Sequence, residues 1–177
     1  MKKYLIAIFC LAPSLASATN SYLYSGIDLS VTKVEGKAYS ADVLLALGLN
    51  VAIDGYNSFA LEAGVQERDE AEGVLLKGSV LYRRNITVNR KYLPYVAGGV
   101  SRVTLASQKC GYSLTSTNPV PTYSYLCNQN YSNSNGITVE AGINIRLAKR
   151  RYLIIKASSF KGGGDTRVNL IGIGGTF

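Results

Sequence analysis

The sequence contains no histidine and no tryptophan, and only three of its 177 residues are cysteine. Histidine is the side chain that ordinarily acts as a general base near neutral pH, and it is also the commonest metal ligand. Without it we expect neither an enzyme nor a metal site. We also expect no cofactor, because the glycine runs at 98–99 and 162–164 lack the strand-to-helix context of phosphate-binding loops.

Long hydrophobic runs are missing after the first eighteen residues. A membrane-spanning helix needs roughly 18 or more consecutive apolar residues, and no later segment approaches that length. If the chain enters a membrane, it must cross with strands.

Residues 1–18 have the pattern of an export signal. The pattern consists of a positive start, an apolar stretch and a small-residue cleavage site: Lys2 and Lys3, residues 5–11, and Ala16-Ser17-Ala18. Cys10 lies inside the apolar stretch and follows a bulky residue, which argues against a lipid anchor. We predict that residues 19–177 form the single mature domain, which reaches the outer membrane after export.

The net charge is +8, and removal of Lys2 and Lys3 leaves +6 on the mature chain. A nucleic-acid partner is not expected, because an exported chain does not meet nucleic acid. Anionic lipid and lipopolysaccharide are the partners that this charge favours, and we expect a monomer.

The mature chain consists of short segments in which apolar and polar residues alternate with a period of two, separated by turn-forming residues. Eight segments follow this pattern: about 22–31, 42–53, 58–66, 74–83, 92–104, 138–147, 152–160 and 166–177. The faces of the fifth segment stay undecided, because Pro94, Gly98 and Gly99 could bend it or mark a bulge. Eight strands predict an all-β fold, an antiparallel up-and-down transmembrane β-barrel.

Alternation alone does not decide which face lies inside, since a membrane barrel is apolar outside and a soluble barrel is apolar inside. The polar face carries many very small residues, which suit the tight interior of an eight-stranded barrel. It also carries charges of both signs, which could pair inside a narrow lumen: Asp28, Asp42, Glu62 and Glu140 with Lys77, Arg146 and Lys156. We predict that these seven residues form a charge network in the lumen.

Tyrosines and basic residues gather where the predicted strands meet the short turns. We interpret them as an aromatic girdle beside lipid headgroups. The girdle comprises Tyr56, Tyr82, Tyr92, Tyr95, Tyr152 and Phe177, with Arg83, Arg84, Arg90, Lys91, Lys149, Arg150 and Arg151.

The last segment ends on Phe177 and carries Ile171 and Ile173 on the same face. In this it resembles bacterial outer-membrane proteins, whose terminal strand is read by the barrel-insertion machinery. Gly175 and Asn169 depart from the usual apolar stripe. The stretch 93–100, LPYVAGGV, also resembles a strand of the small OmpA-like and OmpX-like barrels. The resemblance implies their fold and an outer-membrane location. The enzymes among small barrels, namely lipid A palmitoyltransferases, lipid A deacylases and omptin proteases, all use a histidine that this chain lacks.

Residues 105–135 are expected to form one long extracellular loop. Cys110 and Cys127 are the two cysteines of the mature chain, and an even number in an exported protein favours a disulfide. Tyrosines among serines and asparagines are typical of recognition surfaces, and the loop has four: Tyr112, Tyr123, Tyr125 and Tyr131.

We therefore predict a structural or interaction protein that makes surface contact or adheres to a host or surface ligand through this loop. Two alternatives stay open: a small-solute channel, and a secreted soluble barrel that binds an apolar ligand. A wide pore is not expected, because eight strands leave a lumen that side chains fill.

Overall fold

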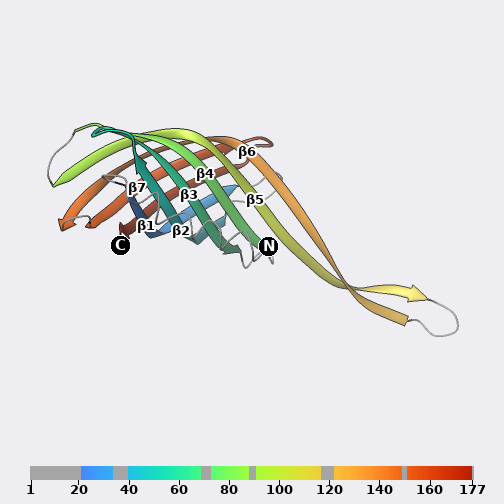
Figure 1. Cartoon of the computed structure of the whole chain (residues 1–177). Helices are drawn as coiled ribbons and strands as arrows, with labels where there is room; N and C mark the ends of the chain where they lie inside the picture. The colour runs from blue at the N-terminus through green and yellow to red at the C-terminus, as the bar shows by residue number, and fades with distance from the viewer. Residues whose placement is uncertain are drawn as a thin grey trace.

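The computed structural model describes residues 21–33, 40–68, 73–87, 91–116, 122–148 and 151–176. For residues 68, 108–110, 112–116 and 122–126 the backbone alone is described. Eight strands form a closed barrel in which each strand pairs with its sequence neighbours and β1 pairs with β8 (Figure 1). The strands are β1 (Tyr22–Lys33), β2 (Ser40–Ala52), β3 (Asn57–Arg68), β4 (Gly73–Asn85), β5 (Tyr92–Ser116), β6 (Thr122–Ala148), β7 (Arg151–Gly162) and β8 (Arg167–Thr176). Within the described residues, no helix is long and apolar enough to span a membrane.

The strand register fixes the size and tilt of the barrel. Every neighbouring pair is antiparallel. Following paired residues once around the wall leads from Tyr22 back to β1 at Thr32, a stagger of ten residues. Strands with such a stagger are strongly tilted, and eight of them enclose a space that side chains fill.

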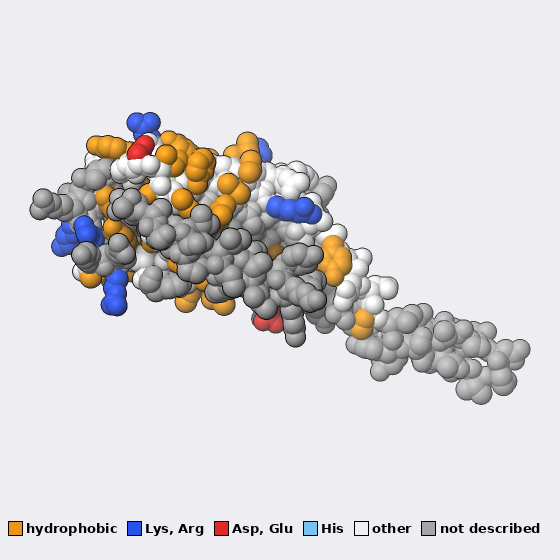
Figure 2. All heavy atoms as spheres, in the orientation of Figure 1, with side chains coloured by type: hydrophobic (Ala, Val, Ile, Leu, Met, Phe, Trp, Pro, Cys, Tyr) orange, Lys and Arg blue, Asp and Glu red, His pale blue; other side chains and the backbone are white. Residues whose placement is uncertain are grey.

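The outer face of the barrel is aliphatic and exposed. Leu29 is 65% exposed on this face, whereas its neighbour Asp28 on the inner face is 1% exposed. Figure 2 shows hydrophobic side chains spread over the barrel surface. Large exposed side chains come from every strand, among them Ile27, Leu45, Leu61, Val80, Val100, Ile137, Ile155 and Ile171. A soluble protein would not present such a belt to water, so the predicted transmembrane barrel is confirmed and the soluble alternative is not supported.

The fifth strand is regular where its sequence left the faces undecided. Tyr95, Ala97, Ser101 and Val103 are buried on the inner face. The pairing of β5 with β6 runs without a shift through Pro94 and both glycines, and its pairing with β4 runs without a shift from Tyr95 through the glycines, so these residues mark no bulge.

The prediction of a long loop at 105–135 is wrong. β5 and β6 continue as a paired hairpin to the pair Ser116 and Thr122, and they project far beyond the barrel wall (Figure 1). The pairing is shifted between Leu114 and Ser116. The alternation that reveals a strand is absent here because both faces of a two-stranded ribbon meet solvent, so neither face needs apolar residues.

Candidate functional site: the filled lumen and the projecting hairpin

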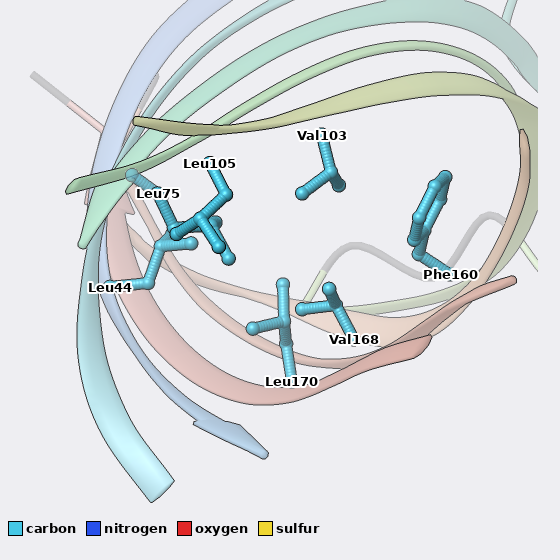
Figure 3. Close-up of a cluster of buried hydrophobic side chains, with 8 residues drawn as sticks. Leu44, Leu75, Val103, Leu105, Phe160, Val168 and Leu170 are labelled. Atoms are coloured by element: carbon cyan, nitrogen blue, oxygen red, sulfur yellow. The ribbon is translucent and has the colours of Figure 1, made fainter. Parts of the chain in front are cut away.

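The half of the lumen that lies toward the hairpin contains a cluster of apolar side chains beside the buried polar residues Ser30, Thr32 and Gln66. Figure 3 shows side chains from opposite walls of the barrel pointing into this space. They form one cluster of buried residues: Leu44, Ala46, Leu75, Val103, Leu105, Phe160, Val168 and Leu170. None of them is more than 6% exposed. We call this cluster the apolar plug, because it excludes water from the end of the barrel where the hairpin leaves.

Paired charges occupy the next level of the lumen, toward the short turns. Arg83 Nη2 lies 2.9 Å from Glu140 Oε1 and 3.4 Å from Glu62 Oε1. Lys156 Nζ lies 3.3 Å from Glu62 Oε2 and 3.4 Å from Asp28 Oδ2. These five residues, which we call the charge cluster, are each at most 9% exposed. Charges buried this deeply persist only when they pair, since desolvation penalises each of them.

Two tyrosines complete the charge cluster. The Tyr95 hydroxyl donates a hydrogen bond to Glu140 Oε1 at 2.9 Å, and the Tyr24 hydroxyl donates one to Glu62. The Arg83 guanidinium lies 4.2 Å from the ring centroid of Tyr95 and 5.7 Å from that of Tyr24. Each ring thus contacts the cation by its face and the carboxylate by its hydroxyl, which fixes both charges in place.

Glycines opposite the two tyrosines provide the space that the rings occupy. Gly48 is the register partner of Tyr24, and Gly142 is the partner of Tyr95. A Cβ atom at either glycine would overlap the ring of its tyrosine. Gly48 and Gly142 are therefore required by these large neighbours.

The predicted charge network is only partly brought together. Asp28, Glu62, Glu140 and Lys156 lie in the charge cluster, and Lys77 is buried in the same lumen. Asp42 lies closer to the hairpin side, where it accepts a hydrogen bond from Gln66 Nε2 at 2.9 Å. Arg146 is exposed at the opposite mouth. It lies two residues beyond Asn144, which is the last buried residue of β6.

The predicted girdle needs two corrections. Tyr56, Tyr82 and Tyr92 are exposed, but Tyr95 and Arg83 are each 1% exposed and lie in the lumen. Arg83 alternates in step with Lys77 along β4, so its inward direction could have been found from spacing. Tyr95 could not, since the faces of its strand were undecided.

A polar pocket of about 250 Å³ opens at the mouth beside the short turns. Its lining includes Tyr22, Asn50, Arg83, Asn144, Arg146 and Tyr152. The Asn144 side-chain amide donates to the Tyr22 hydroxyl at 3.0 Å, and Arg83 of the charge cluster also lines the pocket. A hydrated solute entering here would meet first the charge cluster and then the apolar plug.

Two acidic residues outside the lumen order the connections. In the turn between β2 and β3, Asp54 accepts hydrogen bonds from the Asn57 side chain and from the backbone N–H groups of Tyr56 and Asn57, which hold the pKa of its carboxyl below the usual value. On the hairpin side, the Lys33 ammonium lies 2.6 Å from Asp165 and likewise lowers the pKa of that carboxyl. Asp165 lies in the connection between β7 and β8, where its φ of 58° indicates a tight turn. Its ion pair with Lys33 joins this turn to the end of β1.

The hairpin begins where its neighbours end. Pairing between β4 and β5 extends to Gly73 and Ser107, and pairing between β6 and β7 extends to Gly136 and Gly162. Beyond those pairs β5 and β6 bind only each other among the described strands.

The predicted recognition residues lie in this hairpin. Tyr112 pairs with Tyr125, Leu114 pairs with Tyr123, and Cys110 pairs directly with Cys127. Tyr131 is 66% exposed, and its hydroxyl donates to the Gln129 side chain at 3.0 Å. The side chains of Tyr112, Tyr123, Tyr125 and Cys110 are outside the described part.

The predicted insertion signal is described in part. Ile171 and Ile173 are 67% and 54% exposed on the outer face of β8, where they would contact lipid. Asn169 on the same face accepts a hydrogen bond from Ser159 at 2.8 Å, which satisfies a polar group near the border of the belt. Phe177 and the predicted export signal at 1–18 lie outside the described residues.

No family model matches the sequence, and no curated protein matches it. The fold is nevertheless similar to solved structures of small bacterial barrels. Neisserial surface protein A gives a TM-score of 0.66 at 12% identity, with 88% of this chain and 95% of that chain covered. The attachment invasion locus protein Ail of Yersinia pestis gives 0.61 at 12% identity with the same coverage. The outer membrane protein OprG from Pseudomonas aeruginosa gives 0.53 at 14% identity, with 89% and 95% covered. The chain therefore has the fold of the small eight-stranded barrels of bacterial outer membranes, together with the lipid-facing belt that such a location requires.

Proposed function

We propose that this chain is a surface-contact protein of the bacterial outer membrane, in which the barrel is the anchor and the β5–β6 hairpin is the contacting part. The observation that carries the proposal is the reach of the hairpin. From Ser107 to Ser116 β5 runs nine residues past its last contact with β4, roughly 30 Å at the rise of a strand.

The composition of the hairpin supports a role in recognition. Tyrosine offers a large contact area at low entropic cost, and serine and asparagine add adaptable hydrogen bonds. The sequence from 122 to 135 contains four tyrosines or leucines among serines, asparagines and a glutamine, and no charged residue. Among the similar structures, the Yersinia pestis protein is named for attachment and invasion, and it also has a structure in complex with the heparin analogue sucrose octasulfate.

A disulfide between Cys110 and Cys127 would rigidify this contact surface. The two residues are direct partners in the register of β5 and β6, which is the placement that such a bond needs. A bridge that closes a loop of this length stabilises it by about 3 kcal/mol. An ordered hairpin loses less entropy when it binds.

A channel is the weaker alternative. The charge cluster and the apolar plug fill successive levels of the lumen, so a hydrated ion has no aqueous route through them. Nor does the lumen supply the groups of a hydrolytic site, since its carboxylates are paired with cations. We propose a role without catalysis.

The test is a variant that lacks the tip of the hairpin. Residues 110–127 are removed and Lys109 is joined to its register partner Asn128 through Asn-Gly, a sequence that favours a tight hairpin turn. Barrel assembly is checked by the shift in gel migration between unheated and boiled samples.

Bacteria that display the variant should bind cultured epithelial cells and basement-membrane extract no better than bacteria without the protein. The double variant Cys110→Ser with Cys127→Ser keeps the length of the hairpin and should bind at a level between those of the unaltered protein and the tip-deleted variant, because a hairpin without the bridge loses more entropy when it binds. Binding by the tip-deleted variant at the level of the unaltered protein would overturn the proposal.

A further inference from the structure

Along the hairpin, the outer edge of β6 has no strand partner within the described part of the chain. β7 ends at Gly162, which pairs with Gly136, so no described strand lies beside residues 128–134. The connection after β7 reaches only the base of this edge, where the Gly163 N–H donates to the Asn135 carbonyl at 3.3 Å. An open edge presents unpaired backbone donors and acceptors, and it is a template for another strand.

The direction of these backbone groups follows from the alternation of an antiparallel ladder. Because the Asn135 carbonyl points away from β5, the backbone groups of Asn133, Tyr131 and Gln129 point the same way. We call residues 128–134 of β6 the open edge.

The open edge lacks the features that usually prevent edge pairing. Natural edges are protected by lysine, proline or bulges. The open edge has none of these: its sequence is Asn-Gln-Asn-Tyr-Ser-Asn-Ser, and its pairing with β5 shows no register shift. Its described side chains are exposed or half-buried.

The same sequence identifies the partner that fits it. When two copies of one edge pair antiparallel, each residue lies opposite a residue of the same short segment, so any charge would meet a like charge and repel. This segment has no charge. Its amide and hydroxyl side chains each carry both a donor and an acceptor, so they are complementary to themselves.

We propose that the open edge pairs antiparallel with the open edge of a second copy of this chain. Antiparallel pairing reverses the direction of the partner's strand, which puts the two barrels at opposite ends of the shared sheet. Since the hairpin projects away from the barrel (Figure 1), this arrangement joins copies in two facing membranes. A single edge is short, and many copies acting together would hold the membranes through avidity.

The proposal deepens the proposed function, on which it rests, by naming a second copy as one partner of the hairpin. The experiment uses the full mature chain reconstituted into two populations of lipid vesicles that carry different dyes. Mixed clusters should form when both populations contain the protein. They should be missing when one population is free of protein.

The first pair of variants separates the backbone from the side chain. Tyr131→Pro removes one outward N–H group without removing a bond to β5, and it should reduce clustering to the level of protein-free vesicles. Tyr131→Thr loses the ring but keeps the N–H group and a good strand former, and it should cluster normally. Gel migration before and after boiling establishes that both barrels are folded.

The second pair of variants tests whether the open edge of one copy contacts the open edge of the other. Vesicles with Asn130→Lys and Ser132→Lys should not cluster with one another, nor should those with Asn130→Glu and Ser132→Glu. A mixture of the two populations should cluster again.

Loss of clustering in Tyr131→Thr, or clustering that persists in Tyr131→Pro, would overturn the proposal. The tip-deleted variant keeps the open edge and should still cluster. If it clusters and yet binds host cells unchanged, the proposed function fails while this inference stands.

Discussion

β5 and β6 pass through two environments, and the same pairing register serves both. Inside the wall each strand has a neighbour on both sides, one face in lipid and the other in the lumen. Beyond Ser107 and Gly136 the two strands pair only with each other among the strands that the structure describes. The difference shows that sequence alternation reports the environment of a strand rather than the strand itself.

The barrel wall and the hairpin also differ in the interactions that stabilise them. The wall is stabilised by its closed ladder and by the filled lumen, with Arg83 paired to two carboxylates. The hairpin has one ladder and the proposed bridge between Cys110 and Cys127. Changes in the lumen should therefore affect the barrel, whereas changes in the hairpin should leave the barrel intact.

The largest effect is expected from the centre of the charge cluster. Arg83→Met leaves Glu62 and Glu140 with fewer partners in a buried site, which should reduce the stability of the barrel by about 3 kcal/mol. Unfolding in guanidinium, followed by far-ultraviolet circular dichroism, measures the change. Arg102→Met on the exposed outer face is the control and should change stability by less than about 0.5 kcal/mol. Equal stability of both variants would contradict the role of the cluster.

The next effect concerns the hairpin alone. Replacing Cys110 and Cys127 with serine should loosen the hairpin by about 3 kcal/mol and leave the unfolding of the barrel unchanged. Protease cleavage within 105–135 should become faster, while the boiled and unboiled gel positions stay those of the unaltered protein. A hairpin equally resistant without the cysteines would show that no bridge orders it.

A smaller effect is expected where glycine makes room for a ring. Gly48→Ala places a Cβ atom on the Tyr24 ring and should cost about 1–3 kcal/mol by overpacking. Gly78→Ala is the matched change, because a Cβ atom there meets open space on the outside of the barrel. The measurement is the difference in guanidinium midpoint between the two variants. Equal midpoints would mean that the Tyr24 ring can move aside without a loss of stability.

The smallest effect lies in the turn before β3. The folded pKa of Asp54 is below its unfolded value, so its contribution to turn stability is full above the unfolded pKa and is lost as the pH falls through the folded one. Side-chain nuclear magnetic resonance titration should show the lowered pKa. Asp54→Asn should abolish the pH dependence in the amide signals of Tyr56 and Asn57, and a dependence that survives the substitution would assign it to another group.

Most of the barrel could be predicted from alternation, because the sequences of seven of its eight strands already distinguish a lipid face from a lumen face. The residues that fill the lumen were harder to predict. Arg83 and Tyr95 have the chemistry of headgroup contacts, and only their position in the alternation directs them inward. The paired strands of the hairpin could not be predicted, although its cysteines and tyrosines are visible in the sequence. A ribbon that is exposed on both faces has no alternation of apolar and polar residues.

The continuity of β5 and β6 from wall to hairpin has a mechanical consequence. Tension applied at a contact on the hairpin runs along the strands, and the hydrogen bonds to β4 and β7 are then loaded side by side in shear. Bonds loaded together resist more force than bonds opened one after another. A cell held by this hairpin would therefore load the barrel in the direction in which its hydrogen bonds resist the most force.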